Sequence, residues 1–564
     1  MSLRAVLTDI WSGVLTADSA ETEVLDFKRE QRSIRDTQID IADAAVCFAN
    51  GAGGVVVVGV EDKGVGPAAF SGTNLDAGAL RRKIYDVTEP PLDVQVEEIE
   101  FEGHRLLAVQ VREGLDVHLR HGRTPTRRSL TDCLPLGPAE ISRLHDERTG
   151  KDWSAGPSAA ALDDVLPETM VQLRGLLRQG GRGTSIADRS DADLCASLGL
   201  TSSDGVLNRA GELLLSPGDD EVVVYQYRTR AGGEVSYGRR WTRPLLTAFL
   251  ETMAVAEARI GTTPVSLSNG QQLQIQDYPV IAVREAVANA VMHGDHRTGQ
   301  PVSIEHSPQM LEVRSPGPLV TGISPANILT HPPKPRFPAL AEALRSMGLA
   351  EKWGQGVDRM FREMIRTGRD TPRVAVLEGQ EPETSVRFAG GPPNSRVTRF
   401  VSSLPYELQD DTDVLLIVSV LMDKRSVSAT SLASVVQREP DAVQLVLHGL
   451  ATADEPLIEA TPRTARRARP DYRLTGTSIA ALGSALAYQA RPRADRDRKV
   501  MAHVREYGWI NNGTLQRMFD LDVQAASEYL KGLVGREVLV RTSEQTRGTA
   551  VRYGPGASFP RTGR

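Results

Sequence analysis

At 564 residues, the chain is too long to fold around one hydrophobic core, and we expect three to five domains. Its formal net charge of −6 excludes a globally basic protein, so any binding of nucleic acid must come from local patches. No apolar run reaches the roughly 18 residues that a membrane helix requires, and the N-terminus lacks the pattern of a signal peptide. We therefore expect a cytoplasmic protein that has no membrane partner.

The three cysteines, Cys47, Cys133 and Cys195, show neither a CxxC pair nor a metal-binding spacing. Apolar residues flank them, so we expect buried thiols that stay reduced. Reduced thiols are typical of a reducing cytoplasm.

The N-terminal region begins with alternating residues. Alternation over residues 21–28 predicts a strand that places Asp26 and Phe27 on opposite faces. A basic segment, residues 118–128, lies downstream. Between them, the apolar patterns predict a helix at 36–50 and strands at 55–60, 94–98 and 106–111.

These elements carry a distinctive set of residues: Glu21, Asp26-Phe27-Lys28, Phe48-Ala49-Asn50, Gly53-Gly54, Gly59-Val60, Asp62, Gly64 and Arg120-x-Gly122. With this set, residues 15–145 resemble the AlbA-like domain of Schlafen proteins and their bacterial relatives.

The resemblance implies a candidate nuclease site, because three acidic residues of this domain form a metal-dependent RNase site in nucleolytic Schlafen proteins. The matching positions are Glu21, Asp26 and either Glu61 or Asp62. Clustered carboxylates can hold a divalent ion that activates water. The alternative is that these carboxylates are structural, with Lys28 as a partner. The basic segment adds candidates for contacting nucleic acid: Arg120, Arg123, Arg127 and Arg128.

A second candidate site begins in the helix expected over residues 284–295. Glu285 and Asn289 are four residues apart, so they project from one face of that helix. The Asn amide oxygen can ligate Mg²⁺, and the carboxylate can orient or deprotonate a water. Downstream, Gly354 and Gly356 open another helix, where backbone N–H groups can approach phosphate.

The segment around this site, residues 265–395, resembles the GHKL (Bergerat-fold) ATP-binding domain, and in particular its RecG-like branch of ATP-dependent transcriptional regulators. The residues that carry the resemblance are Glu285, Asn289, His293, Asp295, Ser315-Pro316-Gly317, Gly322, Arg336, Pro338, Glu351, Gly354 and Gly356. The resemblance implies ATP and Mg²⁺ as cofactors, with Asn289 as the magnesium ligand and Glu285 as the candidate base. Lys334 and Arg336 are further candidate phosphate contacts.

The sequence departs from this family at Gly294, Pro318 and Phe337, and it lacks the adenine-binding Asp near Ser315. Phosphoryl transfer depends on positioned charges, so we expect slow or no hydrolysis, with ATP acting as a ligand.

The C-terminal region shows one pattern twice. Helices at 414–422, 429–437 and 440–450 precede short strands near 457–458 and 472–474, and the order recurs over residues 499–553. Three helices and a basic β-wing are the order of a winged helix-turn-helix. The wings contribute candidate phosphate contacts: Arg466, Arg467, Arg469 and Arg547. Docking to protein is the alternative role for these modules.

We therefore expect a multi-domain α/β (α+β) protein divided as follows: an AlbA-like domain at 1–145, a linker at 146–165, a GHKL module at 166–392 (leading subdomain 166–264, nucleotide-binding core 265–392), and winged helices at 408–478 and 492–558.

The expected function is that of an ATP-binding transcriptional regulator that contacts nucleic acid, DNA rather than RNA, with ATP as effector. A Schlafen-like nuclease gated by ATP and an ATP-dependent scaffold without nucleic acid are the alternatives. A homodimer is expected by analogy with GHKL proteins.

Overall fold

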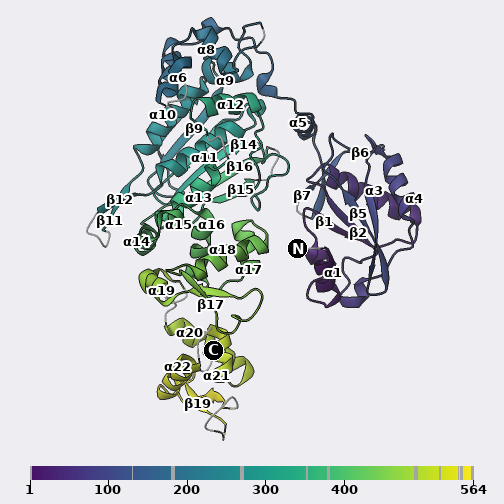
Figure 1. The fold of residues 1–564 in the computed structure, drawn as a ribbon, viewed down its shortest axis with the longest axis vertical. Helices are drawn as coiled ribbons and strands as arrows, with labels where there is room; N and C mark the ends of the chain where they lie inside the picture. The colour runs from purple at the N-terminus through teal and green to yellow at the C-terminus, as the bar shows by residue number, and fades with distance from the viewer. Residues whose placement is uncertain are drawn as a thin grey trace. The chain divides into compact units, whose positions relative to one another are not determined.

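The chain is a multi-domain α/β protein, seen here in a computed structural model (Figure 1). The structure describes the chain except residues 1–2, 130, 180–183, 203, 267–271, 351–353, 378–380, 488–492, 520–522, 544, 546–550 and 561–564. Two compact units divide it. The first comprises Met1–Arg259, Arg284–Gly356 and Arg373–Arg387, and the second comprises Ile260–Val283, Val357–Pro372 and Phe388–Arg564.

The N-terminal part of the first unit is built on a four-stranded sheet in the order β1-β2-β5-β4. Its strands are β1 (Leu25–Lys28), β2 (Gly54–Val58), β4 (Gln95–Phe101) and β5 (His104–Val111). Strand β1 runs parallel to β2, and the other two pairs are antiparallel. The remaining short elements are α2 (Ala17–Ala20), β3 (Thr88–Glu89) and β6 (Leu119–Arg120).

Apolar clusters cover both faces of this sheet. Val56 and Val58 pack with α3 (Ile34–Ala49) and α4 (Ala77–Val87), whereas the intervening Val57 packs with α1 (Leu3–Trp11). This alternation follows from the period of two in a strand. The same alternation buries Phe27 on the α1 side, so Asp26 and Phe27 lie on opposite faces of the sheet, as the sequence predicts.

A hairpin of β7 (Thr126–Ser129) and β8 (Asp132–Pro135) packs beside α3. Cys133 of β8 and Cys47 of α3 form a disulfide, with 5.8 Å between their Cα atoms. The expectation of reduced thiols is therefore wrong for these two residues, because the fold brings together cysteines that are 86 residues apart. Only Cys195 of the three is a free, buried cysteine.

The second sheet has six strands in the order β10-β9-β13-β14-β16-β15. Their bounds are β9 (Glu221–Arg228), β10 (Val235–Thr242), β13 (Val302–His306), β14 (Met310–Pro316), β15 (Arg373–Leu377) and β16 (Glu383–Ala389). Strands β9 and β13 are parallel, whereas β13 and β14 are antiparallel. A separate hairpin joins β11 (Thr262–Ser266) to β12 (Gln272–Gln276).

Helices accompany this sheet along the chain: α6 (Pro167–Gln179), α7 (Thr184–Ala187), α8 (Asp191–Ser197), α9 (Arg209–Leu215), α10 (Leu245–Glu257), α11 (Val280–His293), α12 (Pro338–Ser346) and α13 (Gly356–Arg366). Gly348 and Gly354 adopt positive φ in the turn that separates α12 from α13. Such backbone favours glycine.

The segment expected to be a linker, residues 146–165, is structured. It contains the end of α5 (Pro138–Thr149) and the 3-10 turns Trp153–Ala155 and Leu162–Asp164. Asp152 accepts a hydrogen bond from the Ala339 backbone N–H at 2.6 Å, and Ser154 accepts one from Leu340 at 3.1 Å. These contacts fasten the segment to the start of α12.

The C-terminal part of the second unit contains α14 (Ser395–Ser403), α15 (Tyr406–Gln409), α16 (Thr412–Asp423), α17 (Ala429–Val436), α18 (Pro440–Thr452), β17 (Ile458–Ala460), β18 (Tyr472–Leu474) and α19 (Gly476–Leu482). A second set follows: α20 (Arg493–Tyr507), α21 (Asn512–Phe519), α22 (Val523–Gly535), β19 (Leu539–Arg541) and β20 (Tyr553–Pro555). Strands β17 and β18, and likewise β19 and β20, pair antiparallel. Among the described helices, none has both the length and the apolar character needed to cross a bilayer.

Candidate functional site

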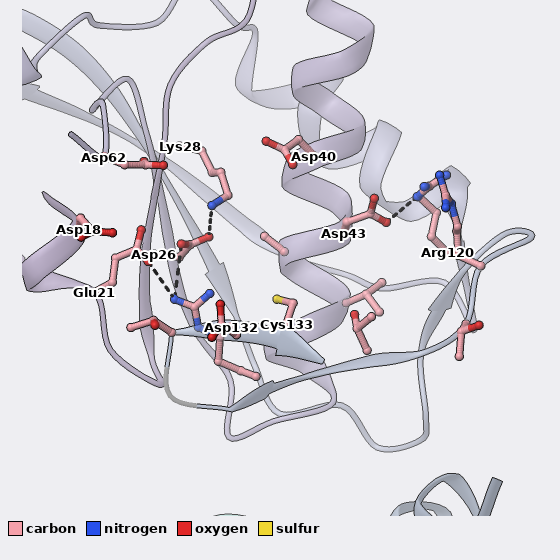
Figure 2. A pocket seen from close by; sticks show the side chains of 17 residues that line it. Asp18, Glu21, Asp26, Lys28, Asp40, Asp43, Asp62, Arg120, Asp132 and Cys133 are labelled. Carbon is pink, nitrogen blue, oxygen red and sulfur yellow. Dashed lines mark hydrogen bonds and ion pairs between the residues drawn. The ribbon is translucent and has the colours of Figure 1, made fainter. Parts of the chain in front are cut away.

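The N-terminal domain contains a cavity of about 590 Å³ that is lined by charged side chains of both signs (Figure 2). Its acidic residues are Asp18, Glu21, Asp26, Asp40, Asp43, Asp62 and Asp132, and its basic residues are Lys28, Arg120, Arg123 and Arg128. Carboxylates outnumber cations, so the cavity is acidic.

Asp26 reaches the cavity because of its register. It pairs with Val56 of β2, so its side chain points to the α3 side of the sheet, opposite to Phe27. The Asp26 carboxylate is 1% exposed, and the Lys28 Nζ lies 2.9 Å from its Oδ2. Arg128 Nη2 lies 3.5 Å from Oδ1. The expected pairing with Lys28 is thus present, and it is joined by an arginine.

Glu21 follows α2 and lies beside Asp26 (Figure 2). Its Oε2 lies 3.4 Å from Arg128 Nη2, and its Oε1 accepts a hydrogen bond from the Phe27 backbone N–H. Burial and the nearby Asp26 raise the pKa of Glu21 to about 7, because both disfavour a second negative charge.

The structure distinguishes the two candidates for the third carboxylate. Asp62 lines the cavity, and burial raises its pKa. Its Oδ1 is buried without a hydrogen-bond partner. Glu61 is about half exposed and pairs with Arg29 at 3.0 Å. The cavity therefore gathers Glu21, Asp26 and Asp62.

This arrangement does not fit a metal ion. Within the part of the chain that the structure describes, no three His, Cys, Asp or Glu side chains are placed to hold one. The guanidinium of Arg128 lies between Glu21 and Asp26, where a divalent ion would need their oxygens. The neighbouring Arg120 is likewise engaged, since its Nε lies 2.5 Å from Asp43 Oδ1. Arg123, which also lines the cavity, is exposed, and Arg127 is half-buried.

In the second candidate site, Glu285 and Asn289 of α11 face the start of α13. A Cβ built on Gly356 would lie 2.7 Å from Glu285 Oε2 and 3.8 Å from Asn289 Nδ2. Both side chains thus share one face, as their spacing predicts. Gly354, with φ of +76°, packs against Pro333. The absence of a side chain at Gly356 lets the backbone there lie close to the two polar groups.

The Asp295 carboxylate is paired with two arginines of the protein. Its carboxylate is 2% exposed and accepts hydrogen bonds from Arg143 Nε at 2.9 Å and Arg297 Nε at 2.8 Å. His293 lies near Arg336 and Arg345, and burial together with these guanidinium groups lowers its pKa to about 4. His293 is therefore neutral at pH 7.

The loop after β14 contains the remaining expected nucleotide contacts. Ser315 is buried at the end of β14, and Gly317 and Gly322 have φ of +88° and +94°. Lys334 donates to the Thr321 carbonyl at 3.2 Å. Arg336 donates to the carbonyls of His293 and Pro318 and to Glu147.

Helix α5 supplies three residues that the sequence pattern did not single out. Glu147 pairs with Arg336 at 2.5 Å and accepts a hydrogen bond from the Thr321 hydroxyl at 2.9 Å. Asp146 pairs with Arg297, as Arg143 does with Asp295. Pro138 at the start of the helix and Gly150 at its end are signals for a helix, but they carry no information about distant partners.

On its other side, α5 contacts the N-terminal domain. The buried Arg148 guanidinium donates to the carbonyls of Gly51 and Gly114. His145 Nδ1 lies 2.8 Å from Asp116.

The loop between β17 and β18 carries the expected arginines. Arg466, Arg467 and Arg469 are exposed, although Arg469 also pairs with Asp441 at 2.5 Å. The loop is closed at its base, where the Thr464 hydroxyl accepts a hydrogen bond from the Asp471 N–H at 2.8 Å. Arg547 lies outside the described residues.

Comparison with known proteins identifies two segments. A family model described as "Schlafen, AlbA_2" matches residues 21–134, and one described as "Putative ATP-dependent DNA helicase recG C-terminal" matches residues 299–382. Both resemblances inferred from the sequence are thus confirmed. The second match begins after α11, so the roles of Glu285 and Asn289 stay predictions.

Two solved structures are similar to the chain. The crystal structure of the DIP2311 protein from Corynebacterium diphtheriae is 24% identical, with a TM-score of 0.55, and the match covers 98% of this chain and 99% of that one. The solution structure of the "N-terminal Domain of Putative ATP-dependent DNA Helicase RecG-related Protein" from Nitrosomonas europaea is 21% identical over 20% of this chain and 74% of that one, with a TM-score of 0.15. No curated protein matches the chain.

Proposed function

We propose that the protein is an ATP-binding regulator of transcription that contacts DNA, with ATP as an effector. The observation that carries the proposal is the convergence of Glu285 and Asn289 on Gly356, in a chain that also has a Schlafen AlbA_2 segment. Asn289 would contribute an oxygen to Mg²⁺, and Glu285 would orient water near the terminal phosphate. The backbone near Gly354 and Gly356 would approach the phosphates.

A substitution of Gly356 tests this site. In Gly356→Ala the added methyl group would lie 2.7 Å from Glu285 Oε2, the far end of a flexible side chain, so the carboxylate must shift. We expect weaker binding of MgATP in calorimetry. Gly449→Ala is a matched control, because a Cβ there has no neighbour within 4 Å. Equal MgATP affinity in both variants would contradict the proposed site.

The DNA contact is supported by the loop between β17 and β18. Its base is tied by backbone and hydroxyl hydrogen bonds, while Arg466 and Arg467 are exposed. A fixed loop loses less entropy when its arginines contact phosphates. The preceding order α16, α17, α18 is that of a winged helix, and the second set repeats it.

The effector role is supported by helix α5. One of its faces bonds to the loop over residues 315–336, and Arg148 bonds to the N-terminal domain. A nucleotide that contacts Lys334 of this loop would alter the energy of these contacts. Such a difference is what a ligand needs in order to shift a conformational equilibrium.

A metal-dependent nuclease is a second candidate because one cavity gathers Glu21, Asp26 and Asp62, but it requires that Arg128 leave the space between Glu21 and Asp26. RNA cleavage that needs Mn²⁺ and disappears in Asp62→Asn would support it. Absence of cleavage under both oxidising and reducing conditions would count against it.

A further inference from the structure

The second C-terminal set of elements, α20 to β20, ends in a small sheet with two different faces. Strand β19 pairs with β20, and Ile510 exchanges two backbone hydrogen bonds of 2.8 Å with Tyr553 of β20. Side chains alternate across a strand, so Ile510 and Leu539 point to the same face, where both are buried in an apolar cluster. Trp509 and Arg552 each precede a residue of the bridge and therefore point to the outer face.

On this outer face, an arginine lies over a tryptophan. In the antiparallel register set by the bridge, Trp509 is opposite Gly554, and Arg552 is its diagonal neighbour. The Arg552 guanidinium lies over the Trp509 ring, with Cζ 4.1 Å from the ring centroid. Because Gly554 has no side chain, the residue directly opposite the indole does not cover it.

A groove of about 480 Å³ lies beside this pair and is lined by Gly508, Trp509, Thr542, Ser543, Gln545 and Arg552. Arg552 is exposed, and Trp509 is half-buried. Arg552 is the one charged residue among the described residues of this lining, which include no carboxylate. The groove therefore presents a planar cation and an aromatic ring to solvent.

An unpaired nucleobase has the chemistry that such a groove would recognise. Bases stack on aromatic rings and on guanidinium planes, and the phosphate that accompanies each base is attracted to an arginine. A base inside a duplex presents only its edges in the grooves, because its faces are stacked on the neighbouring pairs. The pair of Trp509 and Arg552 therefore suits a base that has left the duplex stack.

We propose that the Trp509–Arg552 pair is a stacking platform for an unpaired base of a DNA strand, such as one at a single-stranded end. The inference rests on the proposed contact with DNA and adds the form of DNA that the chain prefers. The loop between β17 and β18 would contact phosphates of the paired part, whereas this platform contacts a base.

Binding of the full chain to three DNAs that share one duplex tests the platform. One is blunt, one has a single-stranded tail of thymidines, and one has an abasic tail of the same length. Both tails carry the same phosphates, so a difference between them is due to the bases. We expect the thymidine tail to bind about tenfold more tightly than the abasic tail, an effect within the range for one stacked base. Aminopurine placed in the tail should lose fluorescence on binding, because stacking quenches it.

Two substitutions separate stacking from charge. Trp509→Leu and Arg552→Lys should each lose most of the difference between the two tails and keep the affinity for the blunt duplex. Arg552→Lys retains the positive charge but not the planar guanidinium. Tyr406→Leu is the matched control, because it removes an exposed aromatic ring from α15, and it should bind all three DNAs like the unchanged chain.

The outcomes separate this inference from the proposed function. Equal affinity for the thymidine and abasic tails would overturn the platform and leave the proposed contact with duplex DNA standing. Absence of binding to all three DNAs would contradict both. A preference for thymidines that survives in Trp509→Leu and in Arg552→Lys would place the base elsewhere. Self-association of the full chain that Trp509→Leu abolishes would assign the groove to a second copy of the chain, and this too would overturn the proposal.

Discussion

Glu147 of α5 and Arg336 of the loop before α12 form a buried ion pair, with side chains that are 7% and 1% exposed. They are 189 residues apart in sequence. The pair connects the helix that follows the segment matched by the "Schlafen, AlbA_2" model to a residue of the segment matched by the recG C-terminal model.

Removing the charge of Glu147 should loosen this connection. Glu147→Gln leaves a buried guanidinium without its counter-ion, which typically costs about 3–5 kcal/mol. We expect faster amide hydrogen exchange in α5 and in residues 315–336. The exposed Glu342 pairs with Arg345 within one helix, so Glu342→Gln should change exchange little. Unchanged exchange in Glu147→Gln would show that the pair is dispensable.

Binding of MgATP should depend on Asn289. Asn289→Ala removes the amide oxygen that would bind Mg²⁺, and we expect the magnesium-dependent part of nucleotide affinity to vanish in calorimetry. Asn289→Asp keeps an oxygen at the same position and should retain magnesium dependence. If Asn289→Ala binds MgATP as the unchanged chain does, the metal ligand lies elsewhere.

Hydrolysis of ATP should be slow. Glu285 is in place as a base, but Arg336 is bonded to Glu147 and to two carbonyls rather than directed at a phosphate. Rate enhancement in phosphoryl transfer comes mostly from such positioned charges. We expect turnover well below about 1 per second, the lower end of ordinary enzymes. Faster turnover that Glu285→Ala removes would make the protein an ATPase.

DNA binding should be salt-dependent. Replacing Arg466, Arg467 and Arg469 by Gln in the full chain should weaken binding evenly across duplex sequences. Each lost phosphate contact should reduce the slope of log K against log salt by about 0.9. Exposed arginines elsewhere provide a control of equal charge change: Arg178, Arg189 and Arg230. If both triple variants weaken binding alike, the effect is one of net charge and not of the loop.

The stability of the second sheet should fall in acid. His306 of β13 is 2% exposed and contacts the Tyr225 hydroxyl at 2.6 Å. Burial lowers its pKa to about 4, whereas an unfolded histidine titrates near 6.5. The unfolded state therefore binds more protons between these values, so this contribution is complete above pH 6.5 and is lost as pH falls to 4.

The size of that effect is on the order of 2–3 kcal/mol. Amide hydrogen exchange of β9 and β13 at pH 7.0 and 4.5, corrected for intrinsic exchange, measures it. The difference between the two pH values should shrink in His306→Gln but not in His448→Gln, which replaces an exposed histidine. An unchanged difference in His306→Gln would assign the acid sensitivity to other groups.

Local pattern sufficed where an element buries one regular face. The strand expected over residues 55–60 overlaps β2 (Gly54–Val58), and the alternation around Asp26 and Phe27 is present. Strand β10 was not expected, because it is an edge strand whose residues, such as Arg239 and Arg240, are largely exposed and polar. A periodic pattern of apolar residues arises where one face of an element is buried. An edge strand whose residues are mostly exposed shows little of that pattern.

The residues of the candidate sites also fall into two groups, those whose arrangement the local sequence pattern predicts and those for which it does not. Spacing within one helix was enough to place Glu285 and Asn289 on one face. The sequence could not predict contacts between segments that are far apart along the chain. These contacts are the pairing of Asp295 with Arg143, the position of Arg128 in the carboxylate cavity, and the disulfide. Each depends on which surfaces pack together, and no local periodicity encodes that.

The parallel pairing of β1 with β2 has a consequence for how this domain can change. Asp26 pairs with Val56 and Phe27 pairs with Val57. These two adjacent residues of β1 therefore point to opposite sides of the sheet, Asp26 to the charged cavity and Phe27 to the apolar core. Deleting one residue upstream in β1 would exchange the two faces, driving a carboxylate among aromatic rings and a phenyl ring among ions. A point substitution in this strand would disturb one side of the sheet, whereas an insertion or deletion would disturb both sides at once.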